Sequence, residues 1–69
     1  MNERNPCIDP RHGDTVTVAG ETREVESING ERVIYSWPHK VAVRTMYIDA
    51  WRTWAANASS YHVAEAQAA

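Results

Sequence analysis

The chain has 69 residues, of which 43% are hydrophobic and 23% charged, and its formal net charge is −2. This length allows one small domain with a thin core, and the composition argues against disorder across the whole chain. The slight acidic excess argues against a general nucleic-acid binder, which usually has a clear basic excess. Three Trp and three Tyr are present but no Phe, so every large ring carries a polar group that suits half-buried and interface positions.

The N-terminal segment gives two indications about the cellular compartment. Cys7 is the single cysteine, which leaves no intrachain disulfide, whereas small secreted domains usually depend on disulfides. Residues 1–6 are polar and no apolar run follows them, so we expect no secretory signal. No segment approaches the length of a membrane span. These features favour a reducing cytoplasm and no contact with a membrane.

Three regions are expected along the chain. Residues 1–12 form an irregular arm, because Pro6 and Pro10 restrict the backbone and no periodicity is present. Residues 13–56 form a small β domain with a closing helix. Residues 57–69 form an alanine-rich tail that is either a frayed helix or disordered.

The first two strands follow the arm. Asp14–Val18 alternates valine with threonine, which is the pattern of a half-buried strand. Ala19 and Gly20 end this strand, and Thr22–Ile28 is predicted to form a second, more charged strand. A four-residue connection between them would place Val16 opposite Val25.

A second hairpin signal lies in the middle of the sequence. Asn29-Gly30 is the strongest short hairpin signal in the chain. Arg32–Trp37 is rich in residues that favour strands and is predicted to be the third strand. Pro38 ends it, because proline cannot donate to a sheet. Val41–Tyr47 is predicted to be the fourth strand.

The register of this central hairpin decides which side chains are buried. A two-residue turn would pair Val25 with Ile34. A three-residue loop would pair Val25 with Tyr35 and Ser27 with Val33. We favour the longer loop, because it gathers the largest apolar side chains onto one face.

A short helix is predicted after the fourth strand. Asp49 is a suitable N-cap, and Ala50–Ala56 favours helix. Trp51 and Trp54 are three residues apart and share one face of this helix. Two helical turns are marginal alone in water, so we expect these tryptophans to pack on the sheet or on a partner.

The predicted elements indicate a mainly β fold. Four short strands with turns between them favour a small four-stranded antiparallel SH3-like barrel with a short C-terminal helix. The alternative is a four-stranded meander with the helix packed on one face.

Several segments resemble a group of small, mostly uncharacterised phage and prophage proteins. The resemblance covers about residues 9–56 and is carried by Asp9–Val18, Gly20, Arg23–Val25, Val33–Tyr35 and Trp51–Ala55. It implies a compact SH3-like barrel that ends in a Trp-x-x-Trp helix. It also implies an origin in a phage or an integrated element, and hence a bacterial cytoplasm. It places no residue in a catalytic role.

Neither a metal site nor an enzyme active site is predicted. Cys7, Asp9 and His12 lie close together, but His39 and His62 would have to complete the set from distant segments. Structural zinc sites use four ligands in short, paired spacings, so we expect no metal and no other cofactor. Cys7 has no positioned base nearby, and the serines lack a nucleophile-elbow motif. We therefore expect a protein that is not an enzyme.

The charge pattern and the aromatic residues favour protein binding. Residues 14–31 contain five acidic residues and one basic residue, whereas residues 37–52 contain three basic residues and one acidic residue. Trp, Tyr and Arg are the types enriched at binding hot spots. We predict a non-enzymatic protein–protein interaction module of phage origin that inhibits or redirects a host factor. The oligomeric state is left open. The predicted partner-binding residues are Trp37, Arg44, Tyr47, Arg52 and Trp54.

Two alternatives remain. In a nucleic-acid-binding barrel, bases would stack on aromatic rings beside basic residues. The acidic second strand argues against a broad phosphate footprint. The other alternative is a minor component of a phage particle or of its assembly. The residues available for a nucleic-acid surface are Tyr35, Trp37, His39, Lys40, Arg44 and Tyr47.

Overall fold

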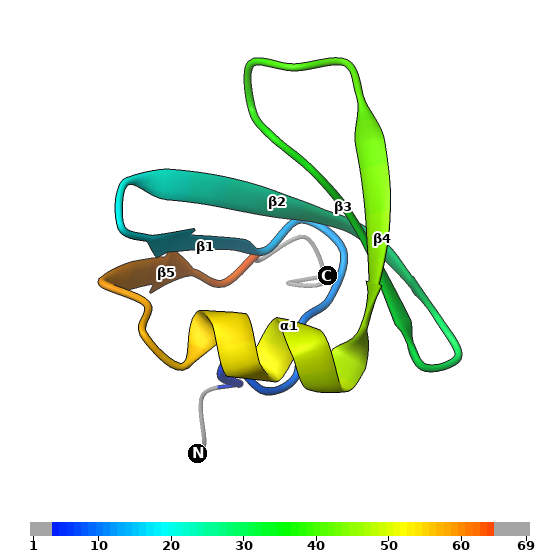
Figure 1. The fold of residues 1–69 in the computed structure, drawn as a ribbon, viewed down its shortest axis with the longest axis horizontal. Coiled ribbons are helices and arrows are strands. Elements are labelled where there is room, and N and C mark those ends of the chain that lie inside the picture. Colours follow the sequence, from blue (N-terminus) through cyan, green and yellow to red (C-terminus); the bar gives the residue numbers. More distant parts are fainter. Residues whose placement is uncertain (1–3, 65–69) are drawn as a thin grey trace.

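A computed structural model describes residues 4–64 of the chain. One antiparallel sheet has the strand order β4-β3-β2-β1-β5, and β4 runs at a steep angle to β1 and β5 (Figure 1). The predicted mainly β, antiparallel fold with one short helix is therefore confirmed. The elements are β1 (Thr15–Val18), β2 (Glu21–Asn29), β3 (Arg32–Ser36), β4 (Val43–Tyr47), α1 (Ile48–Ala55) and β5 (Ser60–His62).

The fifth strand corrects the prediction of four strands. β5 lies in the segment that we expected to be a frayed helix or disordered, and it pairs with β1 along Thr15–Thr17. Its own sequence carries no alternating apolar pattern, so pairing with β1 is what defines it. Along the chain, α1 therefore follows β4 and precedes β5, and it is not the last element of the fold. The prediction for residues 65–69 lies outside the described residues.

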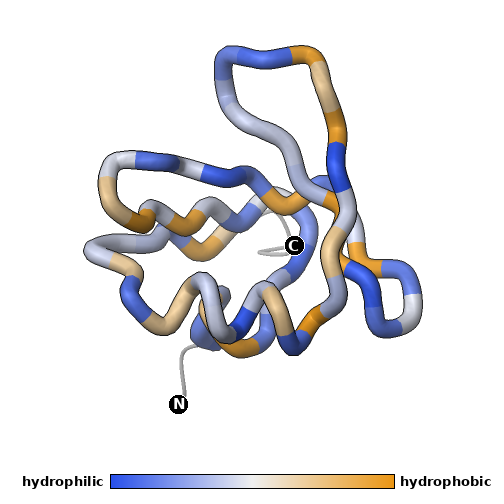
Figure 2. Tube along the Cα trace, viewed as in Figure 1, coloured by the Kyte–Doolittle hydropathy of each residue, from blue (hydrophilic) through white to orange (hydrophobic). Residues whose placement is uncertain are grey.

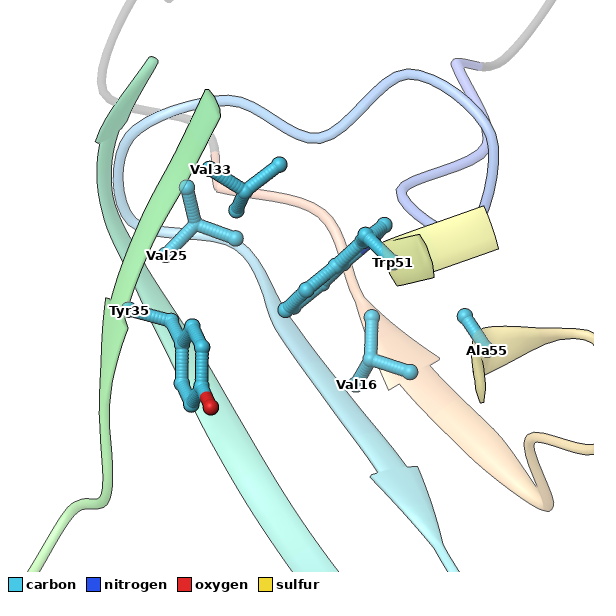
Figure 3. Close-up of a cluster of buried hydrophobic side chains, with 6 residues drawn as sticks. All are labelled: Val16, Val25, Val33, Tyr35, Trp51 and Ala55. Atoms are coloured by element: carbon cyan, nitrogen blue, oxygen red, sulfur yellow. The ribbon is translucent and has the colours of Figure 1, made fainter. Parts of the chain in front are cut away.

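The hydrophobic core lies between the sheet and α1. Trp51 is fully buried at its centre, as Figure 3 shows. Its indole Nε1–H donates to the carbonyl oxygen of Pro6 at 2.9 Å, which ties the N-terminal arm to the helix. The expectation that a tryptophan of the helix packs into the fold is therefore confirmed. The core residues are Val16, Val25, Val33, Tyr35, Trp51 and Ala55.

The start of α1 differs from the prediction. The helix follows β4 without a loop and begins at Ile48, and its N-cap residue is Tyr47, which makes no side-chain capping hydrogen bond. Asp49 lies in the first turn and is not the cap. The backbone N–H of Ile48 donates to the carbonyl oxygen of Glu31 at 2.7 Å. This bond to the β2–β3 turn satisfies one of the amides that a capping side chain would otherwise satisfy.

The central hairpin confirms one part of the predicted register and contradicts another. Val25 pairs with Tyr35, as the longer loop predicted. Ser27, however, pairs with Ile34 instead of Val33, because the register shifts between Val25 and Ser27. This β-bulge adds a residue to β2 and allows a tight turn at the tip while the core pairing is kept.

The first hairpin is also tighter than predicted. Val16 pairs with Arg23 and not with Val25, and Val18 pairs with Glu21. The turn therefore consists of Ala19 and Gly20, whose φ angles are 51° and 84°. Positive φ at both central positions is the mark of a type I′ turn, which matches the twist of the flanking strands. An alanine in this conformation is uncommon, so Ala19-Gly20 is only a weak sequence signal for this turn.

A buried carboxylate joins the two ends of the described chain. Asp14 has no exposed surface. Its carboxylate accepts hydrogen bonds from both terminal nitrogens of the Arg4 guanidinium and from the backbone N–H groups of Arg11 and Ala64. Burial alone would raise the pKa of Asp14, but these hydrogen bonds and the charge of Arg4 hold it below its ordinary value. Asp14 is therefore a structural clasp with all its acceptor positions engaged.

Candidate partner-binding surface

The hairpin between β3 and β4 projects from the body of the fold. Figures 1 and 2 show this projection, on which hydrophobic and hydrophilic residues are neighbours. Val41 is 97% exposed and Val43 is 55% exposed. Lys40 and Arg44 are exposed beside them. We call the exposed residues Lys40, Val41, Val43, Arg44, Thr45 and Tyr47 the β4 surface.

β4 presents side chains on two faces. Arg44 pairs with Tyr35 and Met46 pairs with Val33, so Arg44 and Met46 lie on the face that carries the core. Since side chains alternate along a strand, Val43, Thr45 and Tyr47 lie on the opposite face. Within residues 4–64, β3 is the single neighbour of β4. The second edge of β4 therefore carries backbone groups without a sheet partner.

The base of this hairpin is fixed by an arginine, a carboxylate and a tryptophan. The Glu21 carboxylate oxygen Oε2 accepts from Nε of Arg23 and from Nε1 of Trp37, each at 2.8 Å. These hydrogen bonds, that of Arg23 foremost, lower the pKa of Glu21. The ammonium group of Lys40 lies 5.5 Å from the centre of the Trp37 ring. Trp37 is thereby held at the point where the projection begins.

The same arginine connects this base to the core. The guanidinium carbon of Arg23 lies 4.7 Å from the ring centre of Tyr35 and 4.0 Å from that of Trp54. Both distances are within the range of cation–π attraction. Tyr35 also contacts Trp37 edge-on, with ring centres 5.5 Å apart, and Trp51 and Trp54 are 5.1 Å apart. A continuous aromatic cluster therefore links the helix to the root of the projecting hairpin.

The five predicted partner-binding residues do not lie together on one surface. Trp37 and Trp54 are half-buried parts of the aromatic cluster. Arg44 is exposed on β4. Tyr47 is 58% exposed, and Arg32 both lies over its ring at 4.9 Å and donates to its hydroxyl oxygen. Arg52 donates to the carbonyl oxygen of Ile8 at 2.8 Å and thus joins the helix to the arm.

Sequence reasoning missed the charged pair at the root of the hairpin and the apolar residues at its tip. Glu21 and Arg23 alternate with the same period as Val25, so the strand pattern did contain a signal that all three share a face. Val41 and Val43 were assigned to a regular strand, whereas the structure begins β4 at Val43 and leaves Val41 in the projecting loop.

Two observations on residues 4–64 concern metal binding and the reactivity of Cys7. No group of three or more His, Cys, Asp or Glu side chains among residues 4–64 could hold a metal ion. Burial raises the pKa of the Cys7 thiol, which keeps it protonated and a poor nucleophile. The surface hollow that Cys7 lines, between the arm, α1 and β5, contains no described histidine that could act as its base.

The rings expected for base stacking are mostly occupied. Tyr35 is buried in the core and the indole N–H of Trp37 is bonded to Glu21. Tyr47 is exposed, but Arg32 covers its ring. His39, Lys40 and Arg44 remain exposed. Stacking on adjacent open rings, which single-strand binding uses, has little support from this arrangement.

Two further observations bear on the class of protein. Within the described part of the chain, no helix has the length and apolar character that crossing a membrane requires. Comparison of the chain with protein-family models, with curated proteins and with solved structures gives no match.

Proposed function

We propose that this chain is a non-enzymatic module that binds a protein partner through the β4 surface. The observation that carries the proposal is that exposed apolar and basic side chains lie on β4 and in the loop before it, where no second strand among residues 4–64 pairs with β4. Val41 and Val43 would provide apolar contact area, and Lys40 and Arg44 would steer an oppositely charged partner. The aromatic cluster supports this role, because a rigid base reduces the entropy that is lost on binding.

The resemblance to phage and prophage proteins extends the proposal. It suggests an SH3-like barrel from a phage or prophage that acts in a bacterial cytoplasm on a protein of the host or of the phage. The antiparallel sheet closed by a tryptophan-bearing helix is compatible with it. The proposed partner is a protein and not nucleic acid, because the stacking rings are engaged within the fold.

Charge reversal on the β4 surface tests the proposal. Lys40→Glu combined with Arg44→Glu should abolish capture of a bacterial protein that wild type retains, because an interface charge reversal replaces attraction with repulsion. The control is Asp9→Lys combined with Glu24→Lys, which reverses two charges on the arm and on β2. Quantitative mass spectrometry after affinity capture measures both variants, and circular dichroism verifies that both are folded.

The outcome that contradicts the proposal is equally specific. If the control variant loses the partner and the β4 variant keeps it, the binding surface includes the arm and β2 and not the β4 surface. If oligonucleotides bind the wild type with a steep salt dependence and the β4 variant does not bind them, the surface serves nucleic acid instead.

A further inference from the structure

We infer that the partner supplies an extended acidic segment that pairs with the open edge of β4 and adds a sixth strand to the sheet. This inference rests on the proposed function and specifies the chemistry of the partner. Extended peptides bind exposed sheet edges in this way, with affinity from main-chain hydrogen bonds and specificity from alternate side chains.

The edge of β4 has few of the features that prevent strand pairing. Natural proteins protect open edges with prolines, bulges, charged side chains (lysine above all) or very short strands. β4 contains neither proline nor lysine, and Arg44 is its one charged side chain. It pairs with β3 in unbroken register from Arg32–Tyr47 to Ser36–Val43, whereas the β2–β3 pairing contains a register shift. At five residues, β4 is also longer than the other edge strand, β5, which has three.

Charge selects an acidic partner over a second copy of the chain. Residues 32–47 contain three basic residues and no acidic residue. In an antiparallel pairing of two β4 strands about Thr45, Arg44 of each copy would lie opposite Met46 of the other. Both arginines would then be diagonal neighbours on one face, and like charges in that arrangement repel. An acidic strand replaces this repulsion with attraction to Arg44 and Lys40.

The two faces of β4 also define the side-chain pattern of the partner. Val43, Thr45 and Tyr47 share one face, where β-branched or aromatic side chains of a partner would pack well. Arg44 lies on the other face, where a carboxylate would pair with it. The inferred segment therefore alternates acidic residues with β-branched or aromatic residues.

A set of three synthetic peptides tests this inference on the full chain. The first alternates glutamate with valine and is capped at both ends and long enough to span β4. The second alternates lysine with valine. The third alternates glutamate with proline, which keeps the charge and removes half of the backbone N–H donors. In NMR titrations the first peptide should shift resonances within residues 40–47 and slow amide exchange in β4. The other two should bind at least about tenfold more weakly.

Reversing the charges of the β4 surface provides the most discriminating comparison. In the variant with Lys40→Glu and Arg44→Glu, the preference should invert, so that the lysine–valine peptide binds better than the glutamate–valine peptide. Equal binding of the glutamate–proline and glutamate–valine peptides would overturn strand addition. A glutamate–valine peptide that does not bind, while the captured protein still depends on Lys40 and Arg44, would overturn the inference and leave the proposed function intact. Self-association of the chain that competes with the peptide would instead identify a second copy as the occupant.

Discussion

The Trp51→Ala variant is expected to be largely unfolded at room temperature. Trp51 is fully buried at the centre of the core between the sheet and α1. Loss of a buried tryptophan typically costs about 3–5 kcal/mol, and a domain of this size has a total stability of the same order. The variant also loses the hydrogen bond to the Pro6 carbonyl. Urea denaturation followed by circular dichroism measures the change.

Trp54→Ala is the matched control on the same helix. Trp54 is half-buried, and its ring is covered on one side by Arg23. The variant should therefore fold, with a smaller loss in its free energy of unfolding. A Trp51→Ala variant that melts like wild type would show that the helix is not part of the core, and the rigid base of the β4 surface would lose its support.

The second large effect is expected from Asp14→Asn. The carboxylate of Asp14 accepts hydrogen bonds from Arg4, Arg11 and Ala64. In the asparagine side chain, an NH2 group takes the place of one carboxylate oxygen, so an N–H donor would face the N–H groups that now donate to Asp14. Arg4 would also lose its counter-charge. We expect a loss of about 3 kcal/mol in the free energy of unfolding. The control is Asp9→Asn, whose exposed ion pair with Arg11 should contribute less than about 1 kcal/mol.

The pH dependence of stability tests the contribution of the Asp14 carboxylate independently. The pKa of Asp14 is lower in the folded chain than its ordinary value of 3.8. Its stabilisation is therefore complete above that value and is lost as the pH falls through the folded pKa. Between about pH 5 and pH 2, wild type should lose more stability than Asp14→Asn. Parallel curves for the two proteins would show that Asp14 is not the stabilising carboxylate.

Local patterns predicted the parts of the fold that depend on neighbouring residues. The alternation in β1 identified the buried Val16, and the spacing of Trp51 and Trp54 identified the helix. The preference for burying the largest apolar area identified the pairing of Val25 with Tyr35. For β1 and the helix, the periodicity of one segment was enough to decide which face is buried, whereas the hairpin pairing required a comparison of two registers.

Features that depend on distant parts of the chain were not predictable in this way. β5 has no apolar alternation and is defined by pairing with β1. The clasp at Asp14 brings together Arg4 and Ala64, which no sequence spacing connects. At the candidate site, the sequence indicated a basic segment that contains Arg44. It did not indicate that Trp37 donates a hydrogen bond to Glu21 or that Arg23 lies over the ring of Trp54.

Amide hydrogen exchange, measured on the chain free and in complex with the protein that it captures, locates the partner-binding surface. If the partner binds at the β4 surface, exchange should slow on binding in Val43–Tyr47. Little change is expected in β1 and β5, which lie at the far side of the sheet. Protection confined to β1, β5 or the N-terminal arm, with unchanged exchange in β4, would contradict binding at the β4 surface.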